Sequence, residues 1–391
     1  MCSVMEAPLA EPTFQSLFAH PSVKQFNAYS QAVFKELHSC HTAQKGYHLS
    51  LCDNPTCQQT RHHYHGCGNR HCPHCGTMKR EAWVENRISE LLPTAYYHVV
   101  FTLPQEINGL MMGNRSILFN ALLSTASQTL LNHGKNEEFL GAELGITMVL
   151  HTWGQDLSFH PHVHGIVTGG GWDGEKWVAA KGKNNRFLFP KKSLAKMYKA
   201  VFMKVLESNT QLKWGEINKA KLLQSIRYKA WNVYAKAPFG GPAQVIEYLG
   251  RYTHKIAITK HRILELTQDQ LKFQYKDYAD QNKIKEMWLS HQEFLRRFET
   301  HILPRGFVKI RHYGFLRSKD KHTRIGLIRK ALGLREAPAK VQIPLAIRLL
   351  EKYGRDIGLC PCCKTGRMVL IHDTRSERRE KQRPLPNWAP P

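Results

Sequence analysis

Two histidines separated by one residue stand out in the middle of the chain. Residues 147–153 (TMVLHTW) and 162–168 (HVHGIVT) have the β-branched and aromatic content of strands, and the polar loop GQDLSFHP joins them. Because side chains alternate along a strand, His162 and His164 point to one side while Val163 points into the core. Two imidazoles side by side on a rigid strand are half of a divalent-metal site. Ordinary histidines on an edge strand are the alternative interpretation of this pair when it is taken alone.

A second chemical signal is a block of cysteines. Six of the ten cysteines fall between residues 40 and 75, where several histidines accompany them. Cys72-Pro-His-Cys75 has the spacing of a turn that presents two thiolates to one Zn²⁺. The block predicts structural zinc in a module too small to fold on its core alone, one that also contacts DNA. Eight candidate ligands would fill two tetrahedral sites: Cys40, His48, Cys52, Cys57, Cys67, His71, Cys72 and Cys75. One site with spare cysteines, a redox dithiol and unligated thiols are the alternatives.

A third signal is a pair of tyrosines in residues 237–260. Glycines form a turn there, and Pro242 suits the first position of a helix. Tyr248 and Tyr252 are four residues apart, so on a helix they share one face. Two packed core aromatics are the simpler interpretation. The surroundings are polar and basic, however, which is unusual for a purely packed pair: Glu247, Arg251, His254 and Lys255.

Charge indicates a polyanionic partner. The 391 residues contain 56 Lys and Arg against 31 Asp and Glu, a net charge of +25 spread along the whole chain. Nucleic acid is the first candidate and an anionic membrane surface the second. No stretch approaches the roughly 18 apolar residues of a membrane span, and the first residues lack the basic and apolar regions of a signal peptide. We therefore expect a cytoplasmic protein, in a compartment where disulfides are rare; the family resemblance described below further implies a bacterial, nucleoid-associated one.

The helices and strands that must position these residues are predicted from hydrophobic periodicity and from the residues that cap or end them. We expect a helical lead-in over 14–38 and a helix over 79–92 that ends at Pro93. We also expect a long helical region over 108–132 and a helix over 193–209 that is capped by Ser193. A strand is expected over 94–104, a hairpin over 262–278, a capped helix from Ser290 to Pro304 and a basic strand over 306–316. Cys360-Pro-Cys362-Cys363, with His372 nearby, is a weaker metal signal, and the charged, proline-rich tail from Thr374 is expected to be disordered.

The order of these motifs resembles a known family. HPHVH at 160–164 and YLGRY at 248–252, after a Cys/His block ending in NRHCPHC at 69–75, are similar to the two-tyrosine rolling-circle transposases of bacterial insertion sequences (insertion sequence ninety-one type). These belong to the HUH endonuclease superfamily. The resemblance implies an α+β fold whose nuclease domain has a central antiparallel sheet flanked by helices. We expect a zinc-binding module at 1–92, the nuclease at 93–300 and a basic region with the CPCC motif at 301–391.

The resemblance also assigns roles. His162 and His164 become ligands of Mg²⁺ or Mn²⁺, and Tyr248 and Tyr252 become nucleophiles. For the third ligand we favour Gln155, with His151 next and with His160 and Glu247 as further neighbours. Basic residues expected to contact DNA are Arg251, Lys255, Lys309 and Arg311. The four residues between Cys52 and Cys57 depart from the two-residue spacing expected of the family, which leaves the pairing of the thiolates open.

The chemistry of phosphodiester cleavage agrees with these roles. A metal with open positions neutralises the phosphate, and an in-line tyrosine attacks it. The product is a 5′-phosphotyrosine that keeps the bond energy for rejoining. Two tyrosines allow a second cut while the first end is held, which favours a transposase acting on single-stranded or hairpin ends and on target DNA. A plasmid relaxase or replication initiator, a non-catalytic zinc-dependent DNA-binding protein and a zinc hydrolase are the alternatives.

Overall fold

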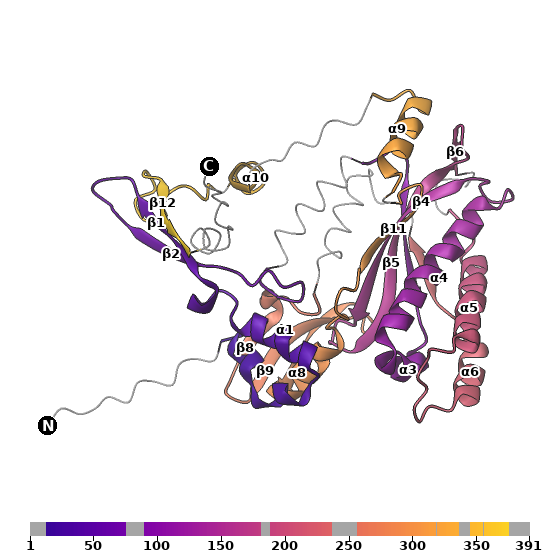
Figure 1. The fold of residues 1–391 in the computed structure, drawn as a ribbon, viewed down its shortest axis with the longest axis horizontal. Coiled ribbons are helices and arrows are strands. Elements are labelled where there is room, and N and C mark those ends of the chain that lie inside the picture. Colours follow the sequence, from indigo (N-terminus) through magenta and orange to yellow (C-terminus); the bar gives the residue numbers. More distant parts are fainter. Residues whose placement is uncertain are drawn as a thin grey trace, which may run out of the picture. The chain divides into compact units, whose positions relative to one another are not determined.

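The computed structural model describes residues 13–75, 90–180, 188–236, 256–317, 319–335, 345–354 and 356–374. The chain forms two compact units (Figure 1). The first comprises Met1–Cys75 with Ala339–Pro391, and the second comprises Gly76–Pro338. Of the region 301–391, the described residues up to 335 therefore belong to the second unit, and those from 345 belong to the unit that contains the N-terminal module. Helices and antiparallel sheets make up both units, so the predicted α+β class is confirmed.

A six-stranded sheet is the centre of the second unit. Its strand order is β11-β4-β5-β3-β7, and β6 pairs with β5 outside this path. Every described pairing in the sheet is antiparallel. The longest strands, β4 and β5, contain the two predicted segments around the His-x-His motif. The bounds are β3 Tyr96–Thr102, β4 Glu143–Trp153, β5 Phe159–Trp172, β6 Trp177–Ala179, β7 Val233–Lys236 and β11 Ile310–Gly314.

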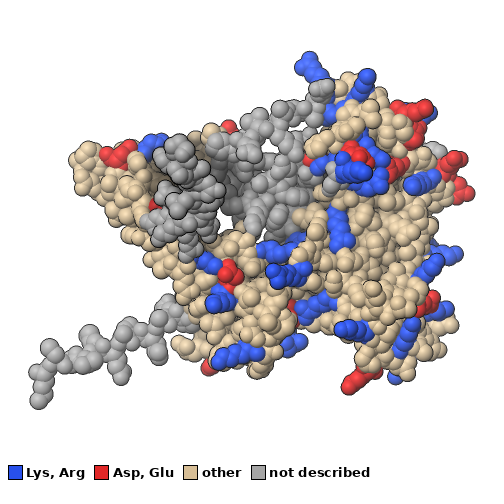
Figure 2. Space-filling model, viewed as in Figure 1, with Lys and Arg blue, Asp and Glu red and all other residues tan. Residues whose placement is uncertain are grey.

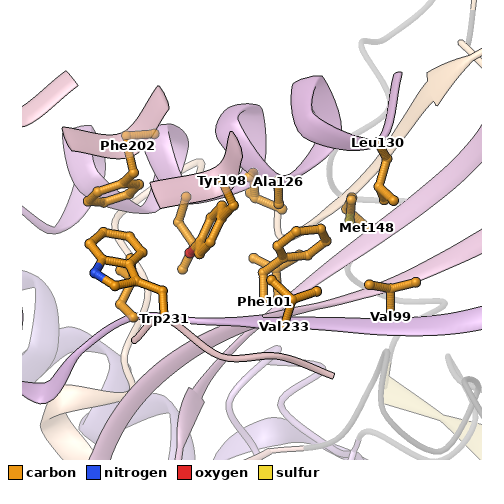
Figure 3. Packing of buried hydrophobic residues seen from close by; sticks show 14 of the residues in the cluster. Val99, Phe101, Ala126, Leu130, Met148, Tyr198, Phe202, Trp231 and Val233 are labelled. Carbon is orange, nitrogen blue, oxygen red and sulfur yellow. The ribbon is translucent and has the colours of Figure 1, made fainter. Parts of the chain in front are cut away.

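One face of this sheet is the main hydrophobic core. Alternate residues of the strands point to it, among them Val99, Phe101 and Met148, and side chains such as Tyr198 and Phe202 cover them (Figure 3). The covering helices are α4 Arg115–Lys135, α5 Lys191–Ser208 and α6 Lys219–Arg227. Burial of one large apolar side chain contributes about 1.5–3 kcal/mol. This face therefore fixes the register of the sheet, and the opposite face is available for polar side chains.

The helix boundaries differ from the predicted ones at two places. The region 108–132 consists of two helices, α3 Asn108–Gly113 and α4, separated by Asn114. The Asn114 side chain donates to the carbonyl of Leu110 at 2.9 Å and accepts from the amide of Lys213 at 2.8 Å. Helix α5 begins at Lys191 and has no side-chain cap, so the predicted Ser193 cap is wrong. The Ser193 hydroxyl lies instead 2.8 Å from Nε2 of His133.

A smaller sheet, in the order β10-β9-β8, also belongs to the second unit. The predicted hairpin is formed by β8 Ile263–Leu266 and β9 Gln270–Asp277, after the short 3₁₀ helix η6 Lys260–Arg262. Strand β10 Lys283–Ser290 was not predicted. Ser290 caps helix α8 His291–Thr300, as predicted, by accepting from the amide of Glu293 at 3.2 Å. The unit also contains η4 Gln105–Ile107 and α9 Lys321–Ala331. Most of the helix predicted over 79–92 lies outside the described residues.

The first unit contains short elements around a three-stranded sheet. The predicted lead-in is formed by η1 Ser16–Ala19, η2 Pro21–Gln25 and α1 Ala28–His38. The sheet has the order β12-β1-β2, with β1 Tyr47–Cys52 in the middle, β2 Thr60–Tyr64 on one side and β12 Met368–Asp373 on the other. η3 Ala43–Lys45 and α10 Leu345–Tyr353 complete the described elements of this unit. Within the described parts of the chain, no helix combines the length and apolar character needed to cross a membrane.

Candidate functional site

The His-x-His motif lies on β5, on the face of the six-stranded sheet opposite the main core. The register pairs His162 with His151 of β4 and His164 with Val149, so His151, His162 and His164 share that face. Each offers one ring nitrogen, and these atoms all lie within 4.8 Å of one another. The Nε2 atoms of His162 and His164 are 3.1 Å apart. Two nitrogens at this distance can reach one cation, since neighbouring ligands of a cation are separated by about 3 Å.

The third histidine of this group is His151, the candidate for the third ligand named after Gln155. His151 is buried, and its ring stacks on Trp153 with a centroid distance of 4.6 Å. Gln155 follows β4 in the loop to β5, and its side-chain amide donates to the hydroxyl of Tyr278 at 3.2 Å. The β4–β5 register explains the difference, because it places His151 directly opposite His162. His160 and His162 have ring centroids 5.2 Å apart, but His160 is exposed and not part of the group.

Hydrogen bonds and burial set the protonation of His162. Its Nδ1 lies 2.6 Å from the backbone carbonyl of His160. A carbonyl only accepts, so this nitrogen carries the hydrogen and Nε2 keeps a lone pair in the neutral ring. Burial lowers the pKa of His162 to about 4, although part of the ring reaches the surface. The ring is therefore neutral near pH 7, with its lone pair directed at His164.

Sequence reasoning missed a fourth histidine in this site. His98 of β3 is buried, and its Nε2 lies 2.9 Å from Nδ1 of His164. The two rings are almost parallel, with an interplanar angle of 6°. When Nε2 of His164 keeps its lone pair for a ligand, Nδ1 carries the hydrogen and His98 accepts it. The strand pattern YYHVVFT could have indicated His98, since Tyr97, Val99 and Phe101 point into the core.

The loop between β4 and β5 is held by residues from distant segments. His301 is buried, and its Nε2 donates to the carbonyl of Leu157 at 3.1 Å. Arg297 donates to the carbonyl of Asp156 at 2.9 Å, and Arg262 donates to the carbonyl of Gln155. These contacts fix the strand ends that carry His151 and His162.

Two of the four predicted DNA contacts lie within the described residues, Lys309 beside Trp153 and Arg311 on the face of the sheet that the helices cover. Lys309 is half-buried, and its Nζ lies 5.6 Å from the centre of the Trp153 ring, on the strand that carries His151. Arg311 of β11 is also half-buried and donates to Asn120. Figure 2 shows that Lys and Arg outnumber Asp and Glu on the described surface in that view. Arg251 and Lys255, like Tyr248 and Tyr252, lie outside the described residues.

The cysteines of the first unit form two groups of four. One contains Cys40, Cys67, Cys72 and Cys75, and the other contains Cys52, Cys57, Cys360 and Cys363. Sulfur–sulfur distances in the first group are 3.4 Å for Cys40–Cys72, 3.6 Å for Cys40–Cys75 and 3.9 Å for Cys67–Cys75. Four thiolates at 2.3 Å from a tetrahedral zinc lie about 3.8 Å apart, whereas a disulfide needs about 2.05 Å. The groups therefore fit zinc and not disulfides.

This grouping changes the ligand set expected from the sequence. Cysteine thiols fill both groups, and His48 and His71 belong to neither. The His48 ring stacks on His63 with a centroid distance of 4.8 Å. The amide of His71 donates to the side chain of Asn69 at 2.9 Å, within the turn that carries Cys72. The physical reason is the long-range pairing of β12 with β1, which brings Cys360 and Cys363 to positions that the predicted set gave to histidines.

Local donors favour the thiolate at some cysteines of each group, whereas burial raises the pKa of Cys52 to about 12. The amides of Cys67 and Asn69 donate to the sulfurs of Cys40 and Cys67, each at 3.4 Å. In the second group, hydrogen bonds from Thr365, together with the amide of Gly366, lower the pKa of Cys363 to about 5. A thiolate is the form that binds a metal.

Comparison with known proteins identifies related sequences for both units. Residues 145–323 match a protein family described as "Putative transposase", and residues 11–103 match a family described as "Transposase zinc-binding domain". The chain is 37% identical over 355 residues to "Putative transposase y4qJ" of Sinorhizobium fredii, covering 87% of this chain and 88% of that protein. It is 29% identical over 292 residues to "Transposase for insertion sequence element IS801" of Pseudomonas savastanoi pv. phaseolicola, covering 72% and 68%. No solved structure matches.

Proposed function

Because this chain belongs to the transposases of bacterial insertion sequences, of the insertion sequence ninety-one type, we propose that it nicks and rejoins single-stranded DNA during rolling-circle transposition. A transposase acts on DNA, and the charge of +25 suits that substrate. The observation that carries the finer proposal is the group of His151, His162 and His164, with their ligand atoms within 4.8 Å of one another. The substrates are then the single-stranded or hairpin ends of the element and its target DNA.

The proposed reaction is a reversible transfer of a phosphodiester to tyrosine. The hydroxyl oxygen of Tyr248 or Tyr252 loses its proton and attacks the scissile phosphorus, while the bond from phosphorus to the 3′ oxygen breaks. The 3′ oxygen leaves and takes up a proton, and the 5′ phosphate remains on the tyrosine. A 3′ hydroxyl of another strand can later attack that phosphotyrosine and release the enzyme. One bond is exchanged for another of similar energy, so no external energy source is needed.

His151, His162 and His164 would hold the metal ion of this reaction. A bound divalent cation supplies neutralisation of charge on the phosphate oxygens and favours the phenolate of the attacking tyrosine. Three imidazoles favour a transition ion such as Mn²⁺ over Mg²⁺, which prefers oxygen ligands. His98 keeps the His164 ring oriented, and the His160 carbonyl does so for His162. Lys309, whose Nζ lies over the Trp153 ring, would contact a phosphate of the bound DNA strand.

The segment that contains both tyrosines has its two flanks fixed near the histidines, which supports the assignment. On one side, β7 pairs with β3, the neighbour of β5 in the sheet. On the other side, Ile256, Ala257 and Ile258 are buried, and Arg262 donates to the carbonyl of Gln155 in the β4–β5 loop. Both described flanks of this segment therefore belong to the unit that carries the histidine group.

Covalent trapping tests the proposal. The purified chain is incubated with Mn²⁺ or Mg²⁺ and single-stranded oligonucleotides from both ends of its own element, and adducts are resolved by denaturing electrophoresis. We expect an adduct in the wild type that the double variant Tyr248→Phe/Tyr252→Phe and His162→Ala abolish. Tyr278→Phe is the matched control, since Tyr278 is exposed and outside the histidine group, and it should keep the adduct. An adduct that persists in the double variant would overturn the tyrosine assignment.

The same assay separates the competing functions. A non-catalytic zinc-dependent DNA-binding protein would bind the oligonucleotides without metal dependence and without an adduct. A zinc hydrolase would cut them with multiple turnovers and leave no protein–DNA bond. A relaxase or replication initiator shares the chemistry, so it would form the adduct on plasmid origin strands and not on the ends of the element. Its substrate preference is therefore the distinguishing measurement.

A further inference from the structure

The second cysteine group joins segments that are about 300 residues apart in the chain. Cys52 ends β1 and Cys57 follows in the turn to β2, whereas Cys360 and Cys363 precede β12. The sulfurs of Cys52 and Cys363 are 3.7 Å apart, and those of Cys57 and Cys360 are 3.9 Å apart. Both distances match the separation of about 3.8 Å between thiolates on a tetrahedral zinc. The match to the zinc-binding family ends at residue 103, so it does not include Cys360 and Cys363.

The backbone around this group is built to present four thiols to one point. The Asn54 side chain accepts from the amide of Thr56 at 3.0 Å, which fixes the turn between Cys52 and Cys57. On the opposite side, the amide of Lys364 donates to the carbonyl of Cys360 at 3.0 Å, which closes the Cys-x-x-Cys turn. The amide of Gly366 donates to the sulfur of Cys363 at 3.2 Å. Each pair of thiols is therefore held by its own tight turn, as in zinc knuckles.

Direct contacts join the two turns. The amide of Asp53 donates to the carbonyl of Arg367 at 2.9 Å, and the amide of Arg367 donates to the Asp53 carboxylate at 2.7 Å. A Cβ on Gly366 would lie 2.4 Å from the sulfur of Cys52, so only glycine allows the two turns to approach this closely. Beyond these turns, β1 pairs with β12 from Cys52 to His48, so the contact between the two segments extends along the strands.

The thiols themselves favour a metal over a packed, unligated cluster. Cys52 and Cys360 are buried, with 2% and 0% of their surface exposed, and the other two are half-buried. Four thiols in such a small volume fill a core poorly and form only weak hydrogen bonds with one another. A tetrahedral zinc would satisfy all four at once, and its binding free energy would become folding free energy of the unit.

From these contacts we propose that Cys52, Cys57, Cys360 and Cys363 bind a second structural Zn²⁺, which fastens β12 to the β1–β2 hairpin. The N-terminal zinc module is then completed by residues 356–374, and a full chain holds one zinc in each cysteine group. This site is independent of the proposed nuclease, because it uses no residue of the histidine group. The zinc count tests this proposal and the covalent adduct tests the proposed nuclease, so either proposal can fail without the other.

The test counts thiolate-bound metal in the full chain. After replacement of zinc by Co²⁺, sulfur-to-cobalt charge-transfer absorption reports thiolate sites and is blind to a histidine-only site, and native mass spectrometry counts the bound ions. We expect the double variant Cys360→Ser/Cys363→Ser to lose half of the absorption and one zinc. Cys362→Ser is the matched control, since Cys362 is exposed, lies between the two ligands and belongs to neither group, and it should keep both. A wild type with one thiolate-bound zinc, or a Cys362→Ser variant that loses one, overturns the proposal.

A second measurement uses the wild type and so avoids variants that fail to fold. The zinc-loaded chain is alkylated, digested and mapped by mass spectrometry. Cys362 should react at once, whereas Cys57 and Cys363 should react only after chelation, although both are half-buried. Alkylation of Cys363 as fast as Cys362 in the loaded chain would show that zinc does not protect it, and the proposal would fail.

Discussion

Replacement of His98 tests whether the histidine group binds metal in the way that its geometry indicates. His98 is buried on β3 and contacts His164 through one hydrogen bond of 2.9 Å. His98→Phe keeps a ring of similar size but removes the nitrogen that accepts from His164. The Nδ1 hydrogen of His164 then loses the acceptor that His98 provides.

The size of the effect follows from that single bond. Leaving one buried donor unsatisfied costs about 1–3 kcal/mol, and every 1.4 kcal/mol changes an equilibrium constant about tenfold. We therefore expect the affinity for Mn²⁺ to fall by about 10–100-fold, a range also typical for loss of a residue that orients a metal-binding histidine. Cleavage at saturating Mn²⁺ should fall less, because the three ligands remain.

Electron paramagnetic resonance of free Mn²⁺ during a titration measures this affinity directly. His98→Gln should recover part of the loss, since its amide oxygen can accept from His164. His160→Ala is the matched control, because His160 contacts His162 through its backbone carbonyl, which the substitution retains. Wild-type affinity in His98→Phe, or an equal loss in His160→Ala, would refute the reasoning.

Three further predictions concern stability and DNA binding. Burial lowers the pKa of His301 to about 4 from its ordinary value near 6.5. The unfolded chain therefore binds the proton more readily than the folded chain, and the free energy of unfolding falls as the pH decreases from about 6.5 to about 4. About 2 kcal/mol should be lost from pH 7 to pH 5 on this account, and urea unfolding of His301→Asn should show a weaker pH dependence; an unchanged dependence counts against the assignment. Gly314→Ala should destabilise the chain more than Gly306→Ala in the same assay. Both glycines have a positive φ, which costs about 1–2 kcal/mol for alanine, but only at Gly314 would the new Cβ also meet a backbone atom, 1.7 Å from the Leu144 oxygen. Equal losses would contradict this. Log affinity for single-stranded DNA should fall with log salt by about 0.7 for each phosphate contacted, and Lys309→Ala should reduce that slope by about one contact, whereas a flat salt response would exclude binding through phosphates.

The parts of the fold that sequence could predict are those with local signals. The strands around His162 follow from alternation and β-branched content, and the cap at Ser290 follows from its spacing to Glu293. The α+β class and the family follow from the order of the motifs. Strand β10 was missed because LKFQYKDY and its partner KIKEMWLS differ in pattern, and charged residues dominate the beginning of the second.

Sequence alone leaves the third ligand open between Gln155 and His151, because the position of His151 depends on strand register. A shift of β4 by one residue would turn His151 into the core and leave the site with two histidines. That register is set by the packing of Ile146, Met148 and Leu150 against the helices, which no local pattern of the β4–β5 loop reveals. Gln155 lies in the loop that Arg262 holds, and its side-chain amide donates to the hydroxyl of Tyr278.

The two cysteine groups illustrate the opposite case, in which the sequence contained the signal. The block at 40–75 has six cysteines, and Cys360 and Cys363 have the two-residue spacing of a zinc knuckle. Together these eight thiols complete two sites of four without any histidine, as the structure groups them. The unusual spacing of Cys52 and Cys57 also has a physical reason. Cys52 ends a strand and Cys57 lies in the following turn, and the compact pair Cys360 and Cys363 meets them from the other end of the chain. The irregular spacing of Cys52 and Cys57 is therefore compatible with the four-thiol group that the structure forms.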